Sequence, residues 1–248
     1  MGGTLQRQAR FDALYRSTNI GEIRGREFGT VVCAGARAQK WIANREPEAD
    51  RAHIDALIAD LATVRCDLFV LVSTVDVFKS PIEVDEATPV DESGLHAYGL
   101  NRRRLEAFVE RQFRHRLIVR LPGLVGPGLR KNVIFDFLND NNVASVDSRG
   151  VFQFYPTVNL WADIRTSVDA GLDLVHLTAA PISVATVSEQ GFGRPFANAT
   201  SNAPARYDLR TRHARAFGGE GHYQYQARDS LMAIRYYAQS EPRSHVKK

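Results

Sequence analysis

Short apolar segments alternate with amphipathic ones in the first half of the chain, and this alternation constrains the fold more than any other feature. Apolar runs at 30–34, 68–72 and 117–121 are typical of strands buried on both faces. Between them, apolar residues recur at helical spacing across 54–61, and a second helix is expected at 98–113. Strands that alternate with helices predict an α/β fold with a parallel sheet.

The second half of the chain carries weaker signals. Residues 152–156 are expected to form a strand, 160–177 a helix and 182–187 a short strand. A short helix is predicted at 134–138. The last residues, 241–248, are predicted to be a disordered tail, since chain ends are often poorly ordered.

The bulk composition is ordinary for a globular protein and disfavours several function classes. Of the 248 residues, 44% are hydrophobic and 24% are charged, and no apolar run is long enough to span a bilayer. The first eight residues lack the apolar centre of a secretory signal, so we expect a cytoplasmic protein with no membrane partner. Cys33 and Cys66 fall in or beside predicted strands and are expected to be reduced.

Charge and histidine spacing argue against nucleic-acid and metal chemistry. The net charge is +4, but the arginines are spread along the chain without a zinc-finger, RNA-recognition or basic-heptad pattern. We therefore predict no nucleic-acid partner. The 7 histidines and 2 cysteines show no metal-ligand spacing, so we predict no metal.

A candidate acid/base site is formed by a hydroxyl at a strand end and a tyrosine at a helix start. Ser73 and Thr74 follow the predicted strand at 68–72, and Tyr98 opens the predicted helix. Arg102 comes one helical turn after Tyr98, so both lie on one helix face. A cation there favours the phenolate, so the sequence predicts a lowered pKa for Tyr98.

These residues stand in an order that resembles the NAD-dependent epimerase/dehydratase family, in the extended branch of the short-chain dehydrogenases/reductases. Residues 71–78 resemble the family's strand end, and Arg-Leu-Pro-Gly-Leu-Val-Gly-Pro-Gly at 120–128 resembles its Arg-x-x-x-Val-Tyr-Gly-Pro-Gly segment. Residues 152–164 match more loosely, and the resemblance covers about residues 1–190. One departure is clear: the superfamily uses Tyr-x-x-x-Lys, whereas this chain has Arg102.

The resemblance implies a Rossmann-like, doubly wound parallel sheet with a small C-terminal substrate domain. It implies an N-terminally incomplete dinucleotide-binding domain at 1–130 and a mainly substrate-binding domain at 131–240, with some segments returning to the Rossmann core. The implied activity is NAD- or NADP-dependent hydride chemistry on a nucleotide sugar or similar polyol. A homodimer is also typical of the family.

The resemblance assigns roles to individual residues. Tyr98 is the expected acid/base, Thr74 the partner of the substrate hydroxyl, and Arg102 the cation that holds the nicotinamide ribose. The expected cofactor-binding residues are Gly2, Gly3, Arg16, Ser17, Ala34, Gly35, Tyr98, Arg102 and Pro122. Weaker substrate candidates are Asp76, His96 and Lys40. A basic residue at 16 leans toward NADP.

The N-terminus departs most from the family pattern. The family's Gly-x-x-Gly-x-x-Gly motif follows an N-terminal strand, whereas this chain begins near the motif's last glycine, and 11–17 would be the second strand. Two explanations stay open: a misassigned or clipped start, which we favour, or a chain that truly lacks the first strand. A non-catalytic relative that keeps the scaffold as a binding or interaction module is the alternative function. For Arg102 itself, the alternative interpretation is a surface arginine at a helix start, with Tyr98 only packing.

Overall fold

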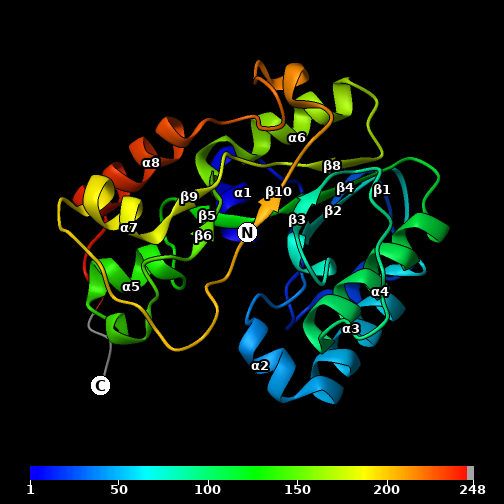
Figure 1. Cartoon of the computed structure of the whole chain (residues 1–248). Helices are drawn as coiled ribbons and strands as arrows, with labels where there is room; N and C mark the ends of the chain where they lie inside the picture. The colour runs from blue at the N-terminus through cyan, green and yellow to red at the C-terminus, as the bar shows by residue number, and fades with distance from the viewer. Residues whose placement is uncertain (245–248) are drawn as a thin grey trace. The chain divides into compact units, whose positions relative to one another are not determined.

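The computed structural model describes residues 1–244 and divides into two compact units (Figure 1). Unit 1 comprises Met1–Ser80, Ala87–Leu121 and Ile164–His176. Unit 2 comprises Pro81–Glu86, Pro122–Asp163 and the chain from Leu177 onward. Each unit is thus assembled from three chain segments. The functional division into a cofactor domain at 1–130 and a substrate domain at 131–240 stays a prediction.

Unit 1 is built on a four-stranded sheet whose strands are all parallel, in the order β1–β2–β4–β8. The strands are β1 (Glu27–Cys33), β2 (Arg65–Thr74), β4 (Arg116–Leu121) and β8 (Leu174–His176). The helices are α1 (Gly2–Gln8), α2 (Lys40–Arg45), α3 (Pro47–Leu61), α4 (Ala97–Gln112) and most of α6 (Leu160–Asp169). This parallel sheet confirms the predicted Rossmann-like α/β class.

Helices α3 and α4 lie side by side against the sheet of unit 1 (Figure 1). Helix α3 begins at Pro47, where a proline costs no helical hydrogen bond. Its inward residues Ile54 and Leu57 join Phe69 of β2 and Val109 of α4 in one buried cluster. Burial of these apolar side chains holds both helices on the sheet, so residues on their facing sides are fixed relative to the strand ends.

Unit 2 is made of short strand pairs and helices. Its strands are β3 (Ile82–Val84), β5 (Gly123–Val125), β6 (Val151–Phe152), β7 (Phe154–Pro156), β9 (Ile182–Ser183) and β10 (Asp208–Leu209), paired as β10–β3, β5–β7 and β6–β9. Its helices are α5 (Val133–Asn139), α7 (Val184–Thr186), a π-helical turn at Val187–Gly191 and α8 (Ala227–Ser240). A second apolar cluster, including Phe137, Phe154 and Ile234, forms its core.

The predicted strand at 11–17 is wrong. These residues form no strand and are mostly exposed. A strand persists only when its backbone groups pair with a neighbour, and among the described residues β1 pairs with β2 while no segment pairs with 11–17. Without a partner, an extended segment has no ladder to stabilise it.

Two boundaries in the second half of the chain were also predicted wrongly. The helix expected at 160–177 ends at Asp169, because Gly171 adopts a left-handed conformation (φ 67°) and Leu174–His176 pairs with β4 instead. The strand expected at 182–187 stops at Ser183. There the Ser183 hydroxyl accepts a hydrogen bond from the Thr186 backbone at 3.1 Å and caps a helix.

The predicted disordered tail lies partly outside the described residues, which end at Ser244. Within unit 2, the Glu241 carboxylate accepts a hydrogen bond from the Gly128 backbone, and the Ser244 backbone donates to the Asn139 side chain. Among the described residues, the helices are too short or too polar to cross a bilayer.

Candidate active site

The end of strand β2 carries a hydroxyl, a carboxylate and a nearby ammonium group. The Thr74 hydroxyl accepts a hydrogen bond from the backbone N–H of Asp76 at 3.2 Å and lies 3.5 Å from the Asp76 carboxylate. Lys40, at the start of α2, donates from Nζ to Asp76 Oδ1 at 2.7 Å. The structure therefore brings together Thr74 with two of the weaker candidates, Asp76 and Lys40.

Helix α4 begins at this strand end because its first turn fits closely against it. His96 is the N-cap, and its Nδ1 accepts a hydrogen bond from the Gly99 backbone at 3.0 Å. A side chain on Gly99 would collide with the backbone oxygen of Asp76. The Tyr98 backbone N–H donates to Asn44 Oδ1 at 2.9 Å. A small residue at 99 therefore lets the helix approach Thr74.

Arg102 is not the surface arginine that the alternative interpretation expects. Its side chain is 3% exposed, and its guanidinium carbon lies 4.2 Å from the centroid of the Tyr98 ring. Its NH1 and NH2 groups donate to the two carboxylate oxygens of Asp50 at 2.6 and 3.1 Å. A further bond from NH2 goes to the backbone oxygen of Arg37. Arg102 therefore packs against Tyr98 as half of a buried ion pair.

The predicted lowering of the Tyr98 pKa is wrong in net direction. Burial raises the pKa of the Tyr98 phenol above its ordinary value of 10.0. The positive charge of Arg102 and hydrogen bonding by Thr74 lower it, while the charge of Asp76 adds to the rise. The predicted effect of Arg102 is present, but loss of water around the phenol outweighs it.

His96 is another titratable group near Tyr98, with its ring centroid 6.3 Å from that of the tyrosine. Burial, together with the positive charge of Lys40, lowers the pKa of His96 below its ordinary 6.5. The neutral ring is the form that can accept the capping bond from Gly99 through Nδ1. Protonation and capping of α4 are therefore linked.

The other predicted cofactor residues come from several parts of the chain. Arg16 and Ser17 lie in an exposed segment, where the Arg16 backbone N–H bonds Asn19 Oδ1 at 2.7 Å. Ala34 and Gly35 follow strand β1, a few residues before the Arg37 oxygen that binds Arg102. Gly2 and Gly3 form the first turn of α1, and a Cβ on either would meet nothing within 4 Å. Pro122 belongs to unit 2.

Sequence reasoning missed Asp50 and Asn44, which hold Arg102 and Tyr98. A signal for Asp50 was present, because it lies four residues before Ile54 and so shares the inward face of α3. An acidic residue on an apolar helix face indicates a buried partner.

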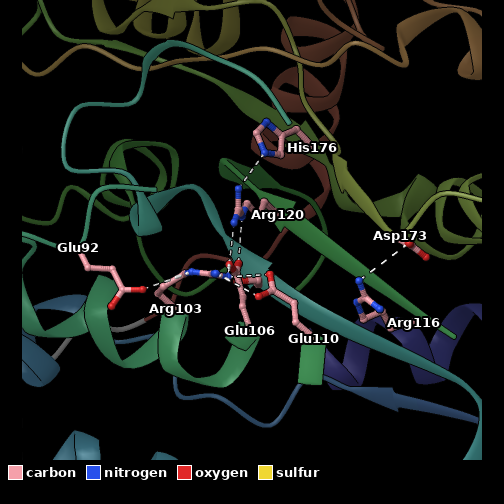
Figure 2. Close-up of polar contacts among 9 residues, drawn as sticks. Glu92, Arg103, Glu106, Glu110, Arg116, Arg120, Asp173 and His176 are labelled. Carbon is pink, nitrogen blue, oxygen red and sulfur yellow. Dashed lines mark hydrogen bonds and ion pairs between the residues drawn. The ribbon is translucent and has the colours of Figure 1, made fainter. Parts of the chain in front are cut away.

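A second charged network, also missed, anchors the middle of α4 (Figure 2). Glu106 has no exposed surface and accepts hydrogen bonds from Arg120 on β4 at 2.7 and 3.0 Å. The Ser73 hydroxyl donates to the same carboxylate at 2.5 Å, and Arg103 lies 3.2 Å from it. On its other side, Arg120 lies 3.4 Å from His176 of β8. The network therefore ties α4 to three neighbouring strands.

Solved structures with this fold include several sugar-nucleotide enzymes. A dTDP-4-dehydrorhamnose reductase from Clostridium acetobutylicum superposes with a TM-score of 0.70 at 16% identity, over 95% of this chain and 94% of that one. RMD from Pseudomonas aeruginosa, complexed with NADPH, gives 0.67 at 16% identity over 94% and 89%. A dTDP-glucose 4,6-dehydratase from Streptomyces venezuelae, with NAD bound, gives 0.65 at 16% identity over 89% and 76%.

These likenesses, each at 16% identity, establish the fold alone, which this chain shares with the three proteins named. No protein-family model matches the sequence, and no curated protein matches it either.

Proposed function

We propose that the protein is an NAD(P)-dependent enzyme of the extended short-chain dehydrogenase/reductase type, acting on a nucleotide sugar or similar polyol. The observation that carries the proposal is the grouping of Tyr98, Thr74 and Arg102 at a strand end and helix start. Solved structures with this fold include a reductase and a dehydratase of sugar nucleotides and an NADPH complex. The proposal does not separate reduction, epimerisation and dehydration.

One observation supports a nicotinamide ribose beside Tyr98. Among the described residues, the buried Nε of Arg102 lacks a hydrogen-bond partner, and a ribose hydroxyl can accept from it. The pyrophosphate end has weaker support, because Gly2 and Gly3 make no close approach that demands glycine. The proposed cofactor contacts are therefore Arg102 and Tyr98 first, with Gly2, Gly3, Arg16, Ser17, Ala34, Gly35 and Pro122 less supported.

In the proposed mechanism, a bound nicotinamide supplies the hydride acceptor or donor. Tyr98 takes the proton from a substrate hydroxyl, or returns it to a carbonyl oxygen, at its phenol oxygen. Thr74 hydrogen-bonds the same substrate oxygen and so orients it. Arg102 favours the anionic form of Tyr98 through its charge. Asp76, held by Lys40, is the candidate second acid of a dehydratase.

Two measurements test the proposal. Titration calorimetry with NAD, NADH, NADP and NADPH is expected to show binding to the chain as given. Turnover of a panel of nucleotide sugars is then measured by nicotinamide absorbance. In this assay Tyr98→Phe is expected to lower turnover about 10²- to 10⁴-fold. Full activity of that variant would refute the role of Tyr98.

The Arg102–Asp50 pair also favours a second candidate, a non-catalytic module that keeps the scaffold. In that case the buried pair only stabilises the packing of α3 and α4. Absence of dinucleotide binding and of turnover, in a folded protein, would favour this module over the enzyme.

A further inference from the structure

The guanidinium of Arg102 has a phenol on one side and a carboxylate within bonding distance of two of its nitrogens. Tyr98 lies at 4.2 Å from ring centroid to guanidinium carbon, and Asp50 binds NH1 and NH2. Asn101 also donates to Asp50, at 2.8 Å. Asp50 is 7% exposed and Arg102 3% exposed, so little water screens either charge. Tyr98 therefore lies beside a guanidinium whose counter-charge is buried with it.

We propose that Asp50 sets the proton affinity of Tyr98 by compensating the charge of Arg102. Asp50 is then a positioning residue that fixes the pH range in which Tyr98 can accept a proton. The consequence of Asp50 for catalysis rests on the proposed function. The effect of Asp50 on the titration of Tyr98 is independent of the proposed function. On this proposal, the buried carboxylate of Asp50 reduces the effective charge of Arg102, which lies one helical turn after Tyr98.

Other charged groups also face Tyr98. Asp76 lies at the end of β2, and its charge acts on the phenol. Lys40 of α2 is ion-paired with Asp76 at 2.7 Å, and the ring of His96 at the start of α4 lies 6.3 Å away. Because these groups remain in every variant below, differences between variants report the Arg102–Asp50 pair.

The test is a tyrosinate titration of the full chain by ultraviolet absorbance, with Tyr98→Phe in each background to isolate one residue among the 8 tyrosines. Asp50→Asn keeps the shape of the side chain and one acceptor oxygen, removes its charge, and replaces the other oxygen with an NH2 donor. The apparent pKa of Tyr98 is expected to fall by on the order of one unit, because Arg102 then acts uncompensated.

Asp55→Asn is the matched control. Asp55 also lies on α3 and pairs with an arginine of α4, Arg104, at 2.6 Å, but this pair is exposed. The titration of Tyr98 is expected to stay unchanged there. A fall equal to that of Asp50→Asn would show a general charge effect and overturn the proposal, as would an unchanged or raised pKa in folded Asp50→Asn.

A double variant keeps the test decisive if Asp50→Asn fails to fold. Asp50→Asn with Arg102→Gln leaves neither charge buried, and the pKa of Tyr98 is expected to stay within about half a unit of the wild type. A rise of a full unit or more would show that Arg102 acts uncompensated in the wild type and would overturn the proposal. If the titrations behave as expected while turnover is absent, the proposed function fails and the role of Asp50 stands.

Discussion

Helix α4 contributes to two buried arginine–carboxylate pairs, and the two are built differently. Arg102 reaches Asp50 of α3 at 2.6 Å, and Glu106 reaches Arg120 of β4 at 2.7 Å. The Glu106 carboxylate is shared by Arg103 and Arg120 (Figure 2) and also accepts from the Ser73 hydroxyl. Arg102 instead stacks on Tyr98 and keeps a nitrogen without a partner among the described residues.

The difference separates a structural pair from one that adjoins the candidate site. A buried charge is stable only when compensated and fully hydrogen-bonded, and the Glu106 carboxylate meets that requirement through four donor bonds. The Arg102 pair instead contacts a titratable ring. Two pairs of the same chemistry thus differ in what lies beside them, which is a closed set of donors at Glu106 and the Tyr98 phenol at Arg102.

The largest expected change in stability follows from removing the carboxylate of the Glu106–Arg120 pair. Glu106→Leu leaves Arg120 buried without its carboxylate, so the free energy of unfolding should fall by about 3–5 kcal/mol. Chemical denaturation followed by circular dichroism measures it. The control is Glu110→Ala, whose carboxylate is partly exposed and pairs with Arg103, with an expected loss below about 1 kcal/mol. Equal losses in the two variants would contradict the distinction between the pairs.

A smaller loss of stability is expected when a substitution pushes α4 away from the end of β2. In Gly99→Ala the new methyl group meets the Asp76 backbone oxygen, so stability should fall by about 1–3 kcal/mol although alanine favours helices. Gly3→Ala in α1 is the matched control, because its methyl group meets nothing within 4 Å and should be neutral or stabilising. Thermal unfolding of both variants decides the matter, and a stable Gly99→Ala would show that the approach is looser than described.

The smallest expected change in stability comes from protonation of His96. Its pKa is lowered in the folded chain, so the unfolded chain binds the proton more readily as pH falls below 6.5. This contribution to stability is therefore present above pH 6.5 and is lost as pH falls through the lower folded value. His96→Asn keeps an N-cap that does not titrate, and should flatten the stability profile measured by denaturation between about pH 7 and 5. An unchanged slope would exclude His96 as its source.

Much of unit 1 was predictable from local pattern. The buried strands at 30–34, 68–72 and 117–121 and the helix from Tyr98 were expected within a few residues, because apolar periodicity records which faces are buried. The strand at 11–17 was not predicted correctly, because strand formation depends on a pairing partner that local pattern does not specify. The helix at 160–177 was overextended because its residues 174–176 pair with β4.

The sequence by itself determined the α/β class and brought attention to Thr74, Tyr98 and Arg102, since residue order and helical spacing are local properties. Only the tertiary structure decided that Arg102 is buried and paired with Asp50, 52 residues earlier in the chain. It also decided the net direction of the pKa shift of Tyr98, because burial raises this pKa more than the charge of Arg102 lowers it. Desolvation and long-range ion pairing depend on how α3 and α4 pack on the sheet, and no local pattern contains that information.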